Sequence, residues 1–270
     1  TKMYVNNYRC LVNFEIDFDA LTLLLGANGS GKTTIFDILY NIRRLVIDND
    51  RVGDIFSLDD MTVWLDSNIQ TFELSVKGND GIYVYKLVIE NNKEGKRLQI
   101  DSETLYHNGK RLFEFVKGKV EMHLDDRSGL GYPSDPTRSA LTIVSDNYEN
   151  KKITWFKDWV EMLFILSIQP KTMSAIAENE SSWLKPDGTN FVSWYRYISQ
   201  EHQDKIPDIF NYLRESIPGF DSFKLENVGK SKNLKVGFRS EDKTKKTQFF
   251  DFNHISDGQR VLIVLHMLLI

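Results

Sequence analysis

Residues 21–34 read LTLLLGANGSGKTT, in which a run of apolar residues passes directly into a glycine-rich loop. The loop matches the pattern GxxxxGK[ST], with Gly26 and Gly31 at the two glycine positions and Lys32 and Thr33 after them. Backbone N–H groups at a helix N-terminus can wrap a phosphate chain, and glycine lets the backbone come close to it. The stretch therefore predicts a phosphate-binding loop between a strand and a helix.

The residues of this loop have different expected roles. Lys32 is expected to reach the β- and γ-phosphates of a nucleotide and is a candidate catalytic residue, and the Thr33 hydroxyl is expected to bind Mg²⁺. ATP and Mg²⁺ are thus the expected ligands, and a chance glycine turn is the alternative. The candidate nucleotide contacts are Gly26, Ala27, Asn28, Gly29, Ser30, Gly31, Lys32, Thr33 and Thr34.

The flanks of the loop agree with this interpretation. Residues 14–18 alternate between apolar and acidic side chains, which is typical of a half-buried strand. The continuous apolar run at 21–25 predicts a fully buried strand. Residues 33–47 carry apolar side chains at helical spacing, namely Ile35, Ile38, Leu39, Ile42 and Leu45. The local order is therefore strand, glycine loop, helix.

The rest of the chain falls into stretches of different periodicity. Residues 48–66 predict little regular structure. An antiparallel sheet is predicted within 71–123, from the segments FELSV, IYVYKLVIE, RLQI, ETLYH and KVEMH. Its turns are expected at GND, NNKEG and HNGK. Residues 125–136 predict a flexible connection. Helices are expected from about Ile153, over 189–200 and over 206–217, then strands at 220–228, 233–238 and 247–252, then a helix opening at Ser256.

This order predicts an α/β fold, in which a P-loop NTPase core like that of an ABC-ATPase head carries an antiparallel β-subdomain and an inserted helical subdomain. The expected domains are residues 1–125 (core with β lobe), 126–218 (helical lobe) and 219–270 (return to the core).

Composition limits the classes of protein. A formal net charge of -4 excludes a strongly basic DNA-coating protein and an acidic disordered one. One cysteine, Cys10, excludes an internal disulfide framework, fits a reducing compartment and is predicted to be a small core residue. Residues 1–7 lack the apolar stretch of a signal peptide, so we expect a cytoplasmic protein. The apolar run 261–270 is far too short for a bilayer span, and its abrupt end leads us to expect a longer natural polypeptide.

A second motif narrows the family. Residues 255–260 read ISDGQR and directly precede an apolar helical pattern. This motif resembles the signature of ABC-type ATPases, and more closely the SDG variant of RecF-like, SMC-like and OLD-like ATPases. The opening NNYRCLVNFEIDFDALTLLLGANGSGKTT looks like the start of those ATPase heads. The stretches YKLVIE, LKPDGTNFVSWYRYI and SIPGF resemble ATPases of this group, including some attached to phage-defence systems.

The resemblance implies that two copies dimerise around two ATP molecules. In that arrangement Ser256, Gly258 and Gln259 of one copy close the glycine loop of the other, whereas an ordinary helix cap is the alternative for the motif. Asp257 replaces a glycine of the common signature. We expect its carboxylate to turn away from the phosphates, toward backbone amides of its own helix.

Two further residues match the family pattern. Arg9 matches a basic residue beside the nucleotide, or is a surface arginine. Gln169 matches the glutamine that helps to hold Mg²⁺ and the attacking water, or is a polar residue at the end of a helix. The Asp-Glu segment that follows the signature helix in the family is absent from this sequence, so the chain as given is expected to hydrolyse ATP poorly. His254 and His266 lie at the wrong points to replace the family's switch histidine.

The resemblance implies an ATPase that switches conformation in genome maintenance or phage defence, with DNA and a nuclease or other effector protein as possible partners. The subunit of an ABC transporter and a P-loop small-molecule kinase are the alternatives. Residues 224–246 hold eight Lys or Arg against three Asp or Glu, which favours the solvated face of a hairpin over a DNA contact. The pairs Trp155/Trp159 and Trp194/Tyr195 are expected in cores rather than stacked on bases.

Overall fold

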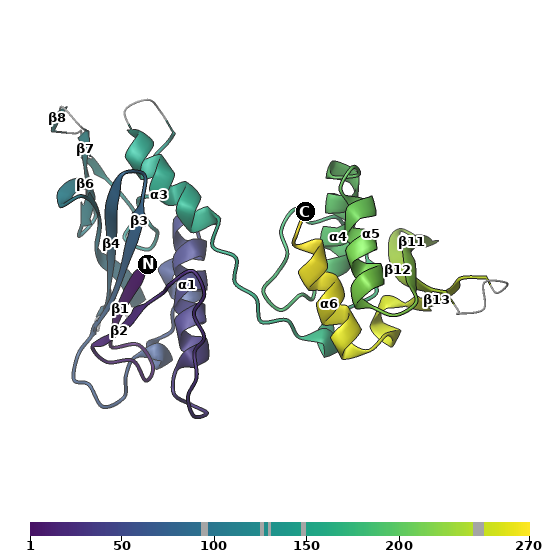
Figure 1. Ribbon diagram of the computed structural model, residues 1–270. Coiled ribbons are helices and arrows are strands. Elements are labelled where there is room, and N and C mark those ends of the chain that lie inside the picture. Colours follow the sequence, from purple (N-terminus) through teal and green to yellow (C-terminus); the bar gives the residue numbers. More distant parts are fainter. Residues whose placement is uncertain (93–96, 125–126, 129–130, 147–149, 240–245) are drawn as a thin grey trace. The chain divides into compact units, whose positions relative to one another are not determined.

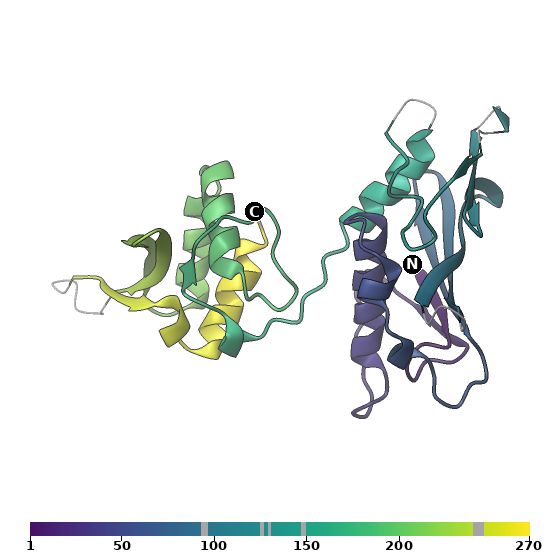
Figure 2. The same cartoon turned by 180° about the vertical axis from the view of Figure 1, so that it is seen from behind.

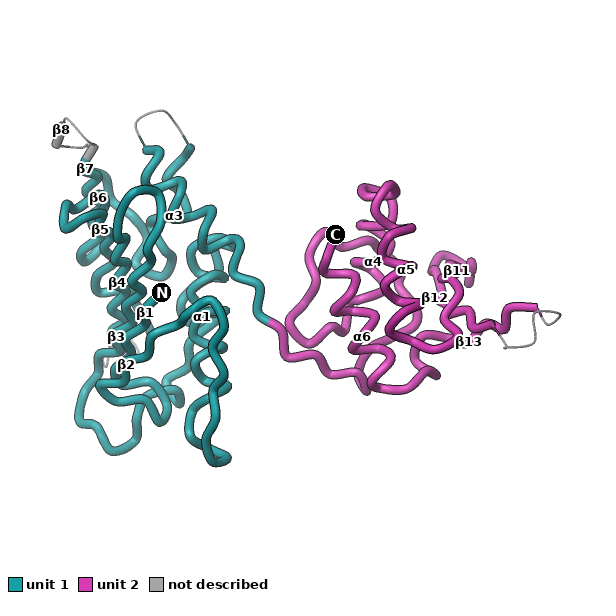
Figure 3. Tube along the Cα trace, in the orientation of Figure 1, with its two compact units in different colours: residues 1–165 teal, residues 166–270 magenta. Residues whose placement is uncertain are grey.

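The computed structural model describes residues 1–270 except 93–96, 125–126, 129–130, 147–149 and 240–245 (Figure 1). The chain forms two compact units, Thr1–Ile165 and Leu166–Ile270, and each unit has a hydrophobic core of its own (Figure 3).

A nine-stranded sheet forms one layer of the first unit. Its strand order is β2-β1-β3-β4-β5-β6-β7-β8, with β9 paired to β7, and every pairing in the described residues is antiparallel. The strands are β1 (Lys2–Asn6), β2 (Phe14–Asp17), β3 (Ile69–Gly78), β4 (Gly81–Asn92), β5 (Arg97–His107), β6 (Lys110–Val116), β7 (Lys119–Leu124), β8 (Arg127–Ser128) and β9 (Tyr132–Pro133).

The turns between the central strands were correctly predicted where the structure describes them. Asn79 and Asp80 join β3 to β4, and Asn108 and Gly109 join β5 to β6, all with positive φ angles. Two consecutive residues with positive φ are what a tight two-residue hairpin requires, and Asn, Asp and Gly adopt this conformation most easily. The predicted turn NNKEG and the predicted connection at 125–136 lie partly outside the described residues.

Helices cover one face of this sheet (Figures 1 and 2). They are α1 (Lys32–Val46) and α3 (Lys151–Glu161), and the short elements α2 (Val52–Ile55) and the 3-10 helix η1 (Leu58–Asp60) follow α1 in the chain. Ile38, Ile42 and Leu45 of α1 are fully buried in the core, as their spacing predicted. Trp155 of α3 stacks on Tyr83 of β4 at 4.5 Å between ring centroids, which confirms it as a packing residue.

The second unit packs three helices against a small sheet. Its strand order is β10-β12-β11, with β13 paired to β12. Phe191 and Phe252 stack at 4.9 Å in its core, and Trp194 and Tyr195 are buried there as predicted. The elements are η3 (Pro170–Thr172), β10 (Ile176–Ala177), α4 (Phe191–Glu201), α5 (Ile206–Ser216), β11 (Phe220–Val228), β12 (Ser231–Phe238), β13 (Gln248–Asp251), η4 (Phe252–His254) and α6 (Asp257–Met267).

The packing differs from the expected domain division in two places. The helix expected to open the helical lobe is α3, and its Ile153, Phe156 and Val160 lie in the core of the first unit. Residues 219–270 share a core with α4 and α5, because Phe220, Leu234 and Ile263 pack in the same cluster as Phe191. The expected return of 219–270 to the first core stays a prediction.

Candidate phosphate-binding site

The glycine-rich loop lies between an extended segment and α1. Gly29 and Gly31 have φ angles of 82° and 89°, in the left-handed region that favours glycine. Gly31 is the N-cap of α1, and a Cβ atom added there would lie 2.9 Å from Cys10 Sγ and 3.0 Å from Leu11 Cδ2. Position 31 therefore requires glycine both for its backbone conformation and for its close contact with the turn between β1 and β2.

Lys32 begins α1, and its side chain folds back over the loop. The Lys32 Nζ atom donates to Gly26 O at 2.8 Å, to Ala27 O at 2.7 Å and to Ser30 Oγ at 3.3 Å. In the described residues these neutral oxygens are its partners, and no carboxylate pairs with it. The ammonium therefore brings an uncompensated positive charge to the centre of the loop.

The first turn of α1 is also suited to an anion. Among the described residues no side chain caps it, and it contains no acidic residue. Its backbone N–H groups and the positive end of the helix dipole therefore face outward from the start of the helix. Thr33 is exposed beside Lys32, whereas Thr34 is buried at 8% relative exposure. The structure thus brings the predicted loop residues into one site, with Thr34 contributing its backbone.

Arg9 lies in the same unit, but its charge is already compensated. Its Nη1 atom donates to Asp37 Oδ2 at 2.6 Å, and its Nε atom donates to Asp60 Oδ1 at 2.8 Å. Burial lowers the pKa of Arg9, but the hydrogen bonds to Asp60 and Asp37 outweigh burial and leave that pKa above its usual value. Arg9 therefore ties the β1–β2 turn to α1 and η1.

Two predictions near the loop were wrong. Cys10 is exposed rather than a core residue, because it lies in the turn between β1 and β2. Residues 21–25 form no strand, and Leu21, Leu23 and Leu25 are 92%, 78% and 83% exposed. In the described residues no strand pairs with this segment, and a strand is buried only when neighbouring strands cover it. Leu24 alone packs against the core of the first unit.

The second predicted motif begins α6 in the second unit. Ser256 and Gln259 form a reciprocal capping box: Gln259 N donates to Ser256 Oγ at 3.3 Å, and Ser256 N donates to Gln259 Oε1 at 3.1 Å. Asp257 was expected to face backbone amides, and this was wrong. Its Oδ1 atom accepts from Arg260 Nη2 at 2.5 Å, because Arg260 lies one turn along the same face of the helix.

Gln169 lies beside this motif. The next residue, Pro170, accepts a hydrogen bond from Arg260 Nη1, so Arg260 links the start of η3 to the start of α6. The Gln169 side chain is exposed, and its backbone N–H donates to Asp187 O at 2.9 Å. The second unit thus brings η3, which directly follows Gln169, into contact with α6, which carries the second motif, although the two lie far apart in sequence.

In the basic stretch 224–246, ion pairs of the described residues support the interpretation as the solvated face of a hairpin. Lys224 and Lys235 both pair with Glu226, and Arg239 pairs with Asp221 at 2.7 Å. His266 lies in α6, as expected of a helix residue, whereas His254, expected in a loop, lies in the short 3-10 helix η4.

Sequence reasoning did not find a cluster on β6 and β7. Glu114, Glu121 and His123 bring ligand atoms within 4.8 Å of one another, since Glu114 lies opposite Glu121 in the hairpin register. Arg111 already pairs with Glu114 at 2.5 Å, so we assign no metal site there.

Comparison with known proteins agrees with this geometry. The sequence model of a family described as AAA ATPase domain matches residues 1–262. The chain belongs to the AAA ATPase domain family. The family match supports a P-loop in this chain, and the predicted loop at 26–34, called the P-loop below, is the candidate for it. A curated relative, the OLD nuclease of Thermus scotoductus (strain ATCC 700910 / SA-01), is 26% identical over 173 residues, which are 55% of this chain and 32% of the relative. The chain thus spans about a third of that nuclease.

The α/β architecture, with its large antiparallel sheet and covering helices, fits an ATPase domain of this family. No helix in the described residues is long and apolar enough to cross a membrane.

Proposed function

We propose that this AAA ATPase domain binds ATP with Mg²⁺ at residues 26–34 and contributes to ATP hydrolysis within a dimer of the RecF/SMC/OLD type, although the chain as given is expected to hydrolyse ATP poorly. The observation that carries the proposal is the Lys32 ammonium, held over the loop by Gly26 O and Ala27 O at 2.8 and 2.7 Å beside the uncapped first turn of α1. A triphosphate offers the compact negative charge that this arrangement fits.

The loop residues fit a magnesium nucleotide. Backbone N–H groups of the loop and of the first turn of α1 would hold phosphate oxygens, and Lys32 would leave its carbonyl partners to pair with them. The exposed Thr33 hydroxyl would bind Mg²⁺, which prefers oxygen ligands. When bound, Mg²⁺ neutralises charge on the phosphates.

For the second half of the site, we propose that the start of α6 in one copy approaches the nucleotide bound by another copy. Two observations support this. The Asp257 carboxylate is paired with Arg260, so it does not leave an uncompensated negative charge near a phosphate. Arg260 also fixes the segment next to Gln169, so Gln169, Ser256, Gly258 and Gln259 would act as one preassembled surface. Gln169 would contact Mg²⁺ and the attacking water.

The resulting association would make nucleotide state a switch, since ATP would favour the dimer over the monomer. The curated relative is named a nuclease. We propose that this domain likewise controls an effector such as a nuclease, acts on DNA in maintenance or phage defence, and works in the cytoplasm.

The test of nucleotide binding is Lys32→Ala, measured by ATP titration of the full chain. Loss of a charged hydrogen-bonding group costs about 1.5–3 kcal/mol, so we expect affinity to fall by about 10- to 150-fold. Lys110→Ala, which removes an exposed positive charge on β6, is the matched control and should leave ATP affinity unchanged. Equal ATP affinity in wild type and in Lys32→Ala would refute the site.

The test of the dimer is Ser256→Arg, measured by sedimentation with and without ATP. The long cationic side chain should block the approach of a second copy while leaving the ATP affinity of the single copy intact, because Ser256 lies outside the P-loop. Ser256→Thr retains the helix cap and should preserve ATP-dependent association. The proposal would be contradicted if Ser256→Arg dimerised at the same ATP concentration as wild type. It would also be contradicted if wild type formed the dimer equally with and without ATP.

A further inference from the structure

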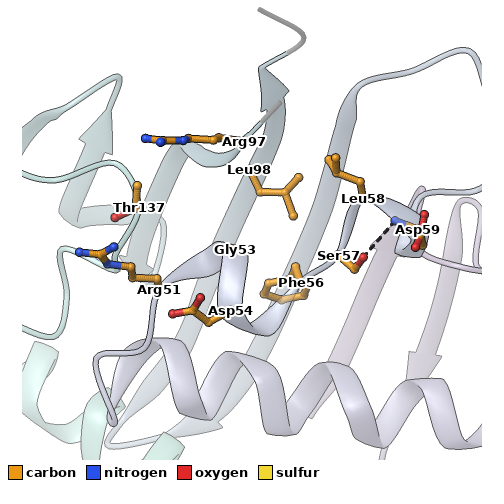
Figure 4. Close-up of a pocket in the computed structure, with 10 residues that line it drawn as sticks. All are labelled: Arg51, Gly53, Asp54, Phe56, Ser57, Leu58, Asp59, Arg97, Leu98 and Thr137. Carbon is orange, nitrogen blue, oxygen red and sulfur yellow. Dashed lines mark hydrogen bonds between the residues drawn. The ribbon is translucent and has the colours of Figure 1, made fainter. Parts of the chain in front are cut away.

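A second pocket lies in the first unit, away from the residues of the P-loop (Figure 4). Its volume is about 580 Å³, within the range of small-molecule sites. It is lined by Arg51, Gly53, Asp54, Phe56, Ser57, Leu58, Asp59, Arg97, Leu98 and Thr137. These residues come from α2 and its flanks, from η1, from the start of β5 and from the segment that precedes α3.

Backbone hydrogen bonds hold the walls of the pocket together. Val52 N donates to Thr137 O at 2.8 Å, which joins α2 to the segment around Thr137, and Ile100 N donates to Pro136 O at 2.8 Å, which joins that segment to β5. Phe56 is buried at 1% exposure and packs edge-on against Tyr8 and at a tilt against Phe72, with ring centroids 5.9 and 5.2 Å away. The pocket is therefore largely preformed, and a ligand would not have to order it.

One end of the pocket carries two unpaired guanidinium groups. Arg51 and Arg97 come from different elements, and Figure 4 shows both side chains at the same end as Thr137. In the described part of the chain neither guanidinium forms a hydrogen bond or an ion pair, although Arg51 lies near enough to Asp135 to help lower the pKa of that carboxyl. Asp54 lies beside Arg51 without pairing with it. Guanidinium groups bind carboxylates and phosphates through two parallel hydrogen bonds, so this end suits an oxyanion.

The other end is apolar with a polar rim. Leu98 and Phe56 lie beneath it and are only 5% and 1% exposed, and Leu58, which is 40% exposed, offers the accessible apolar surface at its side (Figure 4). Asp59 lies at this end, away from Arg51 and Arg97, and its carboxylate can accept hydrogen bonds from an amino group. A fitting ligand has an oxyanion, a flat apolar body and an amine donor, in that order along its length.

We propose that this pocket binds a nucleoside monophosphate, with the phosphate on Arg51 and Arg97, the base against Leu58, and an exocyclic amine toward Asp59. The nucleotide is either a free mononucleotide or the 5′-phosphorylated end of a nucleic-acid strand, because both present a base with a terminal phosphate. The site is separate from the P-loop, which recognises a phosphate chain through backbone N–H groups and Lys32.

The experiment is a calorimetric titration of the full chain with AMP, which lacks the β- and γ-phosphates that the P-loop recognises. Arg51→Ala and Arg97→Ala should each weaken AMP binding by about tenfold or more, because each removes a charged contact to the phosphate. Gly53→Leu should abolish AMP binding. Gly53 lines the pocket with no left-handed φ, and an added Cβ would meet no atom within 4 Å, so a larger side chain can fill the space without disturbing the fold.

Controls separate this site from the P-loop. Lys32→Ala should keep wild-type AMP affinity, and Lys110→Ala should also leave it unchanged. Thermal melting checks that Gly53→Leu is folded, and leucine in place of a helical glycine should not lower its stability. AMP affinity retained within twofold in Arg51→Ala, Arg97→Ala and Gly53→Leu, or no AMP binding by wild type, would overturn the proposal, and loss of AMP binding in Lys32→Ala would place AMP in the P-loop instead.

The chemistry of the ligand is tested with two further probes. Inorganic phosphate should bind at least about tenfold more weakly than AMP, since it lacks the apolar body; equal binding would overturn the proposal. A 5′-phosphorylated oligonucleotide that competes with AMP more strongly than its 5′-hydroxyl counterpart identifies strand ends as the source. Competition by AMP alone identifies a free mononucleotide.

Discussion

Gly31 shows how much a single residue of the P-loop could be predicted. The pattern GxxxxGK[ST] predicted a glycine at the start of a helix, and the structure places Gly31 at the N-cap of α1 with a φ of 89°. The contact that makes any side chain impossible comes from Cys10 and Leu11, about twenty residues earlier in the chain. Sequence spacing carries no information on such a contact, which explains why Cys10 was misassigned to a core.

Glu103 is a buried carboxylic acid with a perturbed pKa that the sequence analysis did not identify. It is fully buried on β5, and its Oε1 atom accepts from Tyr85 OH at 2.8 Å and Ser139 Oγ at 2.5 Å, while its Oε2 atom accepts from Ala140 N at 3.0 Å. Burial raises the pKa of Glu103, although the hydrogen bonds from Ser139, Tyr85 and Ala140 lower it in part. Its role is to hold the segment before α3 against the sheet.

The raised pKa of Glu103 predicts a pH dependence of stability. The folded state holds the Glu103 proton more tightly than the unfolded state. The stability that protonated Glu103 contributes is therefore full below its ordinary pKa of 4.5 and is lost as pH rises through its pKa in the folded state. Glu103→Gln does not titrate. We therefore expect the free energy of unfolding of wild type, relative to Glu103→Gln, to fall as pH rises from 4 toward 8 in urea titrations.

The control is Leu105→Val, which changes a buried side chain of the same strand and no titratable group. Its difference from wild type in the free energy of unfolding should vary much less with pH. A wild-type advantage over Glu103→Gln that grew with pH would show that the hydrogen bonds, and not burial, dominate this carboxylate.

At the scale of elements, the spacing of apolar residues predicted most helices and strands, but it did not predict the irregularities in strand pairing. The spacing of apolar residues correctly predicted α1, α4, α5 and α6 within a few residues. Strand β6 was not predicted, because Leu112 and Phe113 are both buried and interrupt its alternation, and the β5–β6 register shifts between Leu105 and Tyr106. The segments RLQI and ETLYH, predicted as two strands, are the single strand β5.

The apolar run 21–25 is the element whose burial the sequence misjudged, and it gives a sharp test. Leu23 is 78% exposed, whereas its neighbour Leu24 packs against the first core. In this chain Leu23→Ala should change the free energy of unfolding by less than about 0.5 kcal/mol, and Leu24→Ala should lower it by about 1 kcal/mol or more. Denaturant unfolding of the two variants measures the difference. Equal large losses would mean that the run is buried after all.

At the scale of the molecule, local patterns say which face of a helix is buried but not which core buries it. The pattern around Trp155 correctly predicted a packed helix, yet α3 joins the first unit through Tyr83 and Tyr85 of β4. Along the connection, Ile165 packs against the first core and Leu166 against the second. The change of unit falls between two adjacent apolar residues, with no glycine, proline or charge run to mark it.

Two separate cores predict that each unit folds by itself. We expect fragments 1–165 and 166–270 each to give a cooperative thermal transition and a dispersed amide NMR spectrum, because the boundary cuts neither hydrophobic cluster nor any strand pairing in the described residues. Phe252→Ala should lower the free energy of unfolding of fragment 166–270 by about 3–5 kcal/mol, since Phe252 is fully buried against Phe191. Leu269→Ala, at a position that is 66% exposed, is the control and should change it by less than about 0.5 kcal/mol. A fragment 166–270 that melted without a cooperative transition would mean that its helices need the first unit to hold their packing, and α6 could then not present its N-terminus as a preassembled surface.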